Sequence, residues 1–114
     1  MELKVKRVYE PADKDDGFRV LVDRLWPRGV SKERARLDLW AKDVAPSDEL
    51  RTAFHHEGMT WPQFTKAYRS EMAANPAVGE LRATVAERPV VTLLFGSRDV
   101  EHNEAVLLRE ELQD

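Results

Sequence analysis

The sequence predicts an α/β fold in which helices flank a small three-stranded, mainly parallel sheet, within a single domain spanning residues 1–114. Residues 18–22 and 90–95 are apolar runs without polar alternation, which is typical of strands buried on both faces. Residues 23–88, between them, are mostly helical in pattern, so the two strands need a crossover and should pair in parallel. A length of 114 residues matches one domain.

Residues 3–8 and 18–22 are the first two predicted strands. Leu3, Val5 and Val8 nearly alternate with basic side chains, as in a short strand. The second strand should end at Pro27, which cannot donate to a sheet ladder.

The apolar, β-branched run at residues 90–95 predicts the third strand, which should be central in the sheet. The Asp16-Gly17 pair lies between the first two strands and would allow one antiparallel pairing there.

Capping residues predict the helix starts. Ser31, Ser47 and Thr60 each precede a helical pattern and can accept a hydrogen bond from its first turn. Residues 75–76, Asn-Pro, break the third of these helices and begin another, and a last helix is expected from about Asp99 to Leu112. Residues 37–43 are ambiguous between an extended segment and a continuation of the helix before them.

Composition excludes several classes of function. The chain has no cysteine, which removes disulfides, zinc–thiolate sites and cysteine nucleophiles. The net charge of -3 is not that of a general nucleic-acid binder, although residues 19–36 carry six basic side chains against two acidic ones. No segment approaches the roughly 20 apolar residues that span a bilayer, and the first residues lack the apolar run of a signal peptide. We therefore expect a cytoplasmic protein without membrane contact.

Two loops, residues 23–29 and 96–103, follow the second and third predicted strands. Ligands of parallel α/β sheets bind outside the carboxyl ends of the strands, and both loops should project from that edge. The sequence therefore predicts a binding site where these loops meet.

The first loop offers Arg24, Trp26 and Arg28 as ligand-binding candidates. Guanidinium groups suit carboxylate and phosphate oxygens because they are planar, charged and forked. An equally weighted alternative is an ion-pair lattice, in which the two arginines pair with Asp23 and other carboxylates. Trp26, taken alone, is more typical of a core residue than of a ligand platform.

The second loop offers Asp99 and His102 as catalytic candidates and Ser97 and Asn103 as ligand-binding candidates. Its free backbone N–H groups at the start of the last helix favour anions. Asp99 is expected to cap that helix, which would place His102 in the first turn. There the helix dipole would keep the imidazole neutral, as a base or a metal ligand requires. The alternative is a histidine that only bonds a neighbouring loop.

Motifs for a particular cofactor or metal are not found. The adjacent His55 and His56 lack the spacing of the zinc-protease motif, and residues 96–99 lack the second glycine of a nucleophile elbow. No glycine-rich phosphate loop occurs. The sequence therefore assigns no metal site and leaves the cofactor open.

Three segments carry a family resemblance: VDRLWPRG at residues 22–29, LWAKDVAPS at 39–47 and TLLFGSRDVEHNEA at 92–105. They resemble the uncharacterised bacterial and archaeal proteins catalogued as domain of unknown function 488, in the YeaO-like branch. The resemblance spans nearly the whole chain and implies a compact cytoplasmic α/β protein, but no reaction. Longer relatives look as though they carry cysteine and histidine after the last strand. Here Phe95 ends that strand and the chain has no cysteine, so thiol chemistry cannot operate.

Two hypotheses of function follow. The first is a pocket for a small anionic, phosphate- or nucleotide-like ligand, with hydrolase or transferase activity left open. The second is a non-catalytic module that binds a protein or a nucleic-acid backbone through residues 19–36. Arginines that converge on a concave pocket would favour the first, and arginines on a convex surface the second. The sequence leaves the oligomeric state open.

Overall fold

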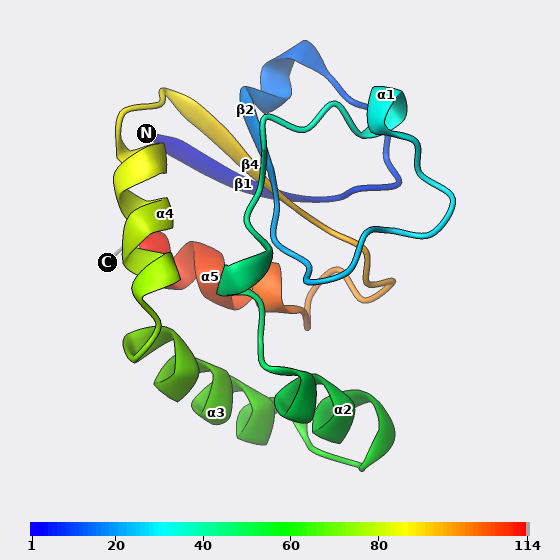
Figure 1. Cartoon of the computed structure of the whole chain (residues 1–114), viewed down its shortest axis with the longest axis vertical. Coiled ribbons are helices and arrows are strands. Elements are labelled where there is room, and N and C mark those ends of the chain that lie inside the picture. The colour runs from blue at the N-terminus through cyan, green and yellow to red at the C-terminus, as the bar shows by residue number, and fades with distance from the viewer. Residues whose placement is uncertain (114) are drawn as a thin grey trace.

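The sheet contains four parallel strands. In the computed structural model, which describes residues 1–113, their order is β1 (Glu2–Arg7), β4 (Val90–Phe95), β2 (Phe18–Leu21) and β3 (Leu39–Trp40). All three pairings between neighbours are parallel. The α/β class and the central position predicted for residues 90–95 are confirmed (Figure 1).

The strand count of three was one too few. The additional strand is β3, within the segment that was ambiguous in sequence. It pairs with Val20 and Leu21, and backbone bonds from Asp38 and Ala41 to β2 extend the pairing. A strand of two residues is too short to produce a periodic pattern, so only its neighbour in the sheet reveals it.

The antiparallel pairing considered at Asp16-Gly17 is wrong. The strands β1 and β2 are not neighbours, because β4 lies between them and bonds to both. The connection instead passes through a short 3-10 helix, η1 (Lys14–Asp16), and crosses over β4. An apolar strand such as β4 gains most from burial on both faces, which its central place provides.

Five α-helices accompany the sheet in residues 1–113. They are α1 (Lys32–Ala35), α2 (Asp48–His56), α3 (Trp61–Ala73), α4 (Pro76–Ala86) and α5 (Glu104–Gln113), and a second 3-10 helix, η2, spans Lys42–Val44. The predicted caps are confirmed, since the side chains of Ser31, Ser47 and Thr60 accept bonds from Arg34, Leu50 and Gln63. None of these helices combines the length and apolar character needed to cross a bilayer.

The two faces of the sheet pack differently. Strand residues such as Val20 and Leu93 join the large core formed with α3, α4 and α5. On the other face, Leu21 and Leu94 pack with Val8 in a smaller cluster. In Figure 1, α2 to α5 lie below and to the left of the strands, and α1 lies at the upper right.

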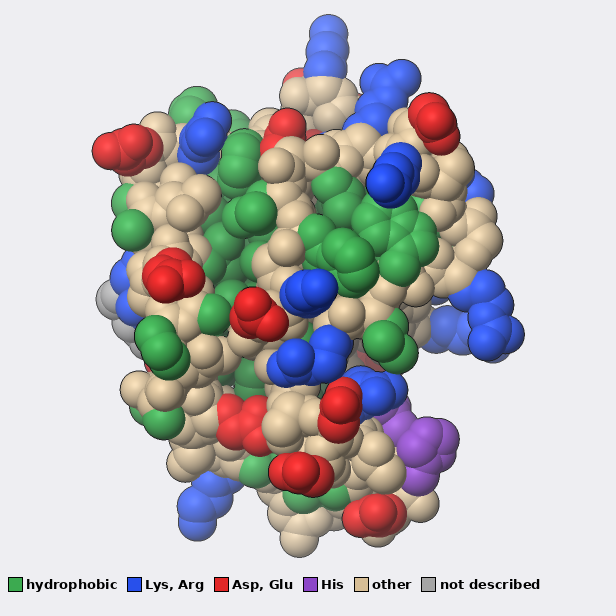
Figure 2. All heavy atoms as spheres, viewed as in Figure 1, with side chains coloured by type: hydrophobic (Ala, Val, Ile, Leu, Met, Phe, Trp, Pro, Cys, Tyr) green, Lys and Arg blue, Asp and Glu red, His purple; other side chains and the backbone are tan. Residues whose placement is uncertain are grey.

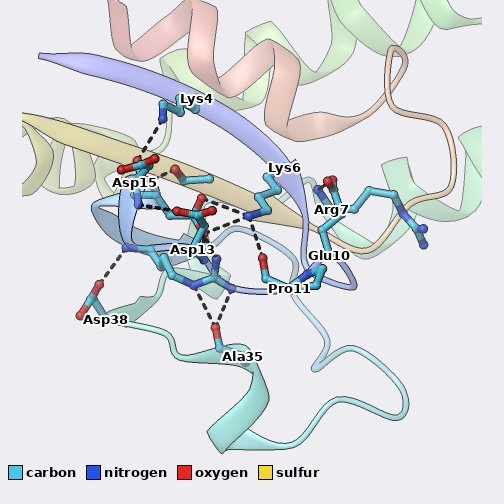
Figure 3. Close-up of polar contacts among 12 residues, drawn as sticks. Lys4, Lys6, Arg7, Glu10, Pro11, Asp13, Asp15, Ala35 and Asp38 are labelled. Atoms are coloured by element: carbon cyan, nitrogen blue, oxygen red, sulfur yellow. Dashed lines mark hydrogen bonds and ion pairs between the residues drawn. The ribbon is translucent and has the colours of Figure 1, made fainter.

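A buried ion cluster fixes the crossover between β1 and β2 (Figure 3). The Asp16 carboxylate accepts hydrogen bonds from Lys6, at 3.1 Å, and from Arg19. Burial raises the pKa of Asp16, but hydrogen bonds from the Asp13 backbone, Lys6 and Arg19 outweigh it and leave the pKa below its ordinary value. Arg19 also donates to the Ala35 carbonyl, at 3.1 and 2.7 Å, so the cluster reaches the end of α1.

We predict that Leu94→Ala lowers the free energy of unfolding by roughly 2–5 kcal/mol, the usual cost of deleting a buried leucine. Leu94 is 0 % exposed and central in the sheet. Urea unfolding measures the loss, and Val100→Ala, at a side chain 56 % exposed, is the control that should change little. A loss below about 1 kcal/mol would contradict a central β4.

We predict opposite effects of alanine at two glycines. Gly17 has a φ of +65°, and a Cβ there would overlap the carbonyl oxygen of Val90 and lie 2.7 Å from its Cβ. Gly17→Ala should therefore destabilise strongly. Gly79 is exposed inside α4 with no atom within 4 Å of an added Cβ, so Gly79→Ala should stabilise by roughly 0.5–1 kcal/mol. Thermal unfolding of both variants tests the contrast, and similar melting temperatures would refute it.

Candidate functional site

A cavity of about 440 Å³ lies where the loops after β2 and β4 face α2. Both loops leave the carboxyl ends of neighbouring parallel strands, so they emerge at one edge of the sheet. Figure 2 shows a hollow in the lower right of this face, beside histidine and basic side chains. The cavity volume falls in the range of small-molecule sites, roughly 300–1,000 Å³.

Asp23 joins the two loops. Its Oδ2 accepts a hydrogen bond from the Gly96 backbone N–H at 2.8 Å, directly after β4. Its carbonyl oxygen accepts from the Trp40 indole, also at 2.8 Å. Asp23 therefore ties the ends of β2, β3 and β4 together at the cavity wall.

Arg24 lines the cavity and is held by backbone carbonyls. Its Nη2 donates to the carbonyl oxygens of Ala45 and Pro46, at 3.2 and 3.4 Å. Its Nε is buried and has no hydrogen-bond partner within residues 1–113, and the exposed Asp48 carboxylate is 3.9 Å away. The Nε donor therefore makes no hydrogen bond within the described residues, and its nearest carboxylate is that of Asp48.

Helix α2 contributes Arg51, Phe54 and His55 to the cavity. Arg51 Nη2 lies 3.3 Å from Asp48, while Arg51 Nε is a second buried donor without a partner in the described chain. Phe54 stacks on Phe64 with ring centroids 4.5 Å apart. Burial, followed by the charges of His56 and Arg51, lowers the pKa of His55, so its imidazole is neutral near pH 7.

The loop after β4 differs from the prediction. Helix α5 begins at Glu104, not at Asp99, and the Asn103 side chain accepts from the Val106 N–H as a cap does. Asp99 instead closes a tight turn by accepting from the N–H groups of Glu101 and His102, each at 3.0 Å. These bonds lower the pKa of Asp99 below its ordinary value. Asp99 and Asn103 both precede α5 and both have side chains that can cap a helix. Asn103, which is nearer the apolar stripe of α5, is the one that caps it.

His102 therefore lies before the helix, and its predicted place in the first helical turn is wrong. Its Nδ1 is 3.1 Å from Asp99 Oδ2, and its ring lies against Trp61 with centroids 5.0 Å apart. His102 lines the cavity, as Arg24 does, so the two loops bring these side chains to one space.

Glu104 completes the cavity and was missed in the sequence. Burial raises the pKa of Glu104 well above its ordinary value, and a hydrogen bond shared with Asp23 raises it further. The sequence offered one indication, since both acids follow strands that should end at the same edge.

The predicted site residues divide into two groups. Four line the cavity: Arg24, Ser97, His102 and Asn103. Three do not: Trp26, Arg28 and Asp99.

Of the predicted site residues outside the cavity, Trp26 packs in the protein and Arg28 lies on its surface. The Trp26 indole donates to the Val30 carbonyl at 2.7 Å, and its ring packs against the smaller core cluster and edge-on to Trp40. Arg28 is exposed, and its side chain makes no ion pair or hydrogen bond in the part of the chain that the structure describes. Within residues 1–113 neither Arg24 nor Arg28 pairs with Asp23, Asp99 or Glu101, but Arg24 does lie in an ion pair with another carboxylate, that of Asp48.

Within residues 1–113, no group of three or more histidine, aspartate or glutamate side chains is placed to hold a metal ion. The carboxyl pair and His102 belong to a polar cavity without that geometry.

The fold and cavity define an α/β protein with an all-parallel sheet and a polar cavity at the carboxyl ends of its two central strands. The chain belongs to the family described as the inactive DUF488-N3 subclade, whose model matches residues 2–114. It is 42% identical over 113 residues to the uncharacterized protein YeaO of Escherichia coli K12, covering 99% of this chain and 98% of that one. It is 44% identical over 108 residues to the uncharacterized protein Rv3073c of Mycobacterium tuberculosis, covering 95% and 91%. No solved structure gives a significant match.

We predict that Glu104→Gln stabilises the protein more at pH 7.5 than at pH 4.5. Above the ordinary pKa of 4.5, the unfolded chain has lost a proton that folded Glu104 keeps. This group therefore lowers stability as pH rises through that window, by up to about 1.4 kcal/mol per pH unit. Glutamine keeps a hydrogen bond to Asp23 without titrating.

Urea unfolding of wild type and Glu104→Gln across this pH range measures the difference. Glu101→Gln, at an exposed carboxylate outside the cavity, is the matched control. If the difference in stability between Glu104→Gln and wild type did not change with pH, Glu104 would have the same pKa in the folded and the unfolded chain, and the prediction would be wrong.

Proposed function

We propose that the protein binds a small anionic, phosphate- or nucleotide-like ligand in the cavity between the two loops and α2. The observation that carries the proposal is the pair of arginines in the cavity wall, Arg24 and Arg51, each with a buried Nε that has no partner within residues 1–113. Buried donors are nearly always hydrogen-bonded, so an acceptor from a ligand would satisfy both.

The charge of the cavity supports an anion. Three guanidinium groups line it, from Arg24, Arg51 and Arg98. Against them stand Asp23 and Glu104 in the lining, where the raised pKa of Glu104 favours its neutral form, and Asp48 outside the lining, which pairs with Arg24 and Arg51. The lining is therefore net positive although the whole chain has a charge of -3.

We propose that the protein binds this ligand without catalysing a reaction. The family is described as inactive, and the chain has no cysteine to act as a nucleophile. The one hydroxyl in the lining, on Ser97, accepts from the Asp99 N–H and contacts no base in the described residues. We also infer a cytoplasmic location, where small domains do without disulfides.

Hydrolysis of the bound ligand is the second candidate, and one contact favours it. Asp99 and His102 form a carboxylate–imidazole pair at 3.1 Å, the arrangement that orients a general base. His102 could then activate a water beside the ligand. Release of product by the wild type, but not by His102→Gln, would establish this candidate over simple binding.

The alternative function, binding of a protein or a nucleic-acid backbone through the basic residues 19–36, has less support than the anion site. Its six basic side chains do not share one surface, since Arg19 is buried against Asp16 and Arg24 lines the cavity. The exposed remainder consists of Arg28, Lys32, Arg34 and Arg36. Binding of nucleic acid that is lost when these four are replaced would favour the alternative function.

We predict that phosphate raises the melting temperature of the protein in a saturable way at fixed ionic strength. A ligand that binds only the folded state stabilises it by about 2.7 kcal/mol at a hundredfold excess over its Kd. Arg24→Met should lose this saturable response, and Arg51→Met should lose it independently if Arg24→Met folds poorly.

Arg28→Met is the matched control, because Arg28 lies on the neighbouring stretch of the same loop but outside the cavity. It should keep the phosphate response of the wild type. Equal responses in all four proteins, or a response that never saturates, would remove the basis for an anion site.

A further inference from the structure

The cavity proposed to bind an anion also contains two carboxyl groups. Asp23 and Glu104 lie in the same cavity as Arg24 and Arg51. A simple inorganic anion would gain from the guanidinium groups but would be repelled by the carboxylate charge. The lining therefore suits a ligand that presents oxygen acceptors at one end and hydrogen-bond donors at the other.

The carboxyl pair is built as a fixed acceptor. Asp23 Oδ2 is held by the Gly96 N–H at 2.8 Å, at the start of the loop after β4. Glu104, the first residue of α5, lines the same cavity as Asp23. Each carboxyl oxygen has two lone pairs, so acceptor positions remain after this bond is made. Hydroxyl groups on neighbouring carbons match such a pair of side-by-side acceptors.

The cavity also has an aromatic side. Phe54 and Phe64 stack at 4.5 Å, and the neutral His55 lies next to Phe54, with centroids 5.3 Å apart. All three line the cavity. Flat, apolar ligand rings bind on such surfaces by stacking.

We propose, on the basis of the anion-binding function above, that the ligand is a nucleotide: its phosphate meets Arg24 and Arg51, its ribose diol meets the Asp23–Glu104 pair, and its base stacks beside Phe54. The three features lie in one cavity of about 440 Å³. This size accommodates a small organic ligand, and a mononucleotide supplies all three complementary groups in a single molecule.

Titration calorimetry with four probes tests the assignment. The probes are inorganic phosphate, ribose 5-phosphate, adenosine 5′-monophosphate and 2′,3′-dideoxyadenosine 5′-monophosphate. The adenosine nucleotide should bind more tightly than its dideoxy analogue by about tenfold or more, the discrimination expected from hydrogen bonds to a charged group. Ribose 5-phosphate, which has the diol but no base, should bind more tightly than inorganic phosphate.

Variants connect the preference to the carboxyl pair. Glu104→Ala should bring the affinity for the adenosine nucleotide down to that of the dideoxy analogue. Glu104→Gln, which keeps an amide acceptor and a hydrogen bond to Asp23, should retain most of the preference. Glu101→Ala, at an exposed carboxylate of the same loop outside the cavity, should bind all four probes as the wild type does.

The two proposals fail differently. Saturable phosphate binding with equal affinities for the two adenosine nucleotides would overturn the nucleotide assignment and leave the anion site intact. A diol preference that persists in Glu104→Ala would overturn the role of the carboxyl pair. Absence of saturable binding by every probe would refute both the anion site and the nucleotide.

Discussion

The ion pair between Asp16 and Arg19 is the interaction on which the arrangement of this sheet depends. It lies where the chain leaves β1 and crosses β4 to reach β2, and Lys6 of β1 bonds to the same carboxylate. The Thr92 hydroxyl of β4 donates to the Asp16 carbonyl at 2.7 Å, so one residue contacts all three strands. Such a buried cluster is costly to break, because removing one partner leaves a buried charge unpaired.

The site is a consequence of that arrangement. With β4 fixed between β1 and β2, the strands β2 and β4 run side by side and end at the same edge. The Asp23–Gly96 bond then joins the loops that follow them. Helix α2 reaches this edge through residues 41–47, and its start is fastened where Ser47 bonds to Glu71 of α3. The cavity is thus enclosed by segments far apart in the sequence.

Local chemistry explains why much of the fold could be predicted. Ser31, Ser47 and Thr60 cap helices because a side-chain oxygen satisfies backbone N–H groups within the same turn. The apolar run at residues 90–95 has no polar side to expose, which requires a central strand. Where two local choices compete, sequence reasoning failed: Asp99 and Asn103 can both cap a helix, and packing of the apolar stripe of α5 selects Asn103.

The sequence by itself determined the α/β class, the starts of the first four helices, the central strand and the two loops that face the cavity, because each depends on residues close together in the chain. Only the tertiary structure decided the rest of the site. It brought Arg51 of α2 into the same cavity as Arg24, placed Glu104 there beside Asp23, and left Trp26 and Arg28 outside the cavity. These outcomes depend on how a helix docks and how a loop turns. Such choices are set by packing energies between distant segments, which no local pattern of residues records.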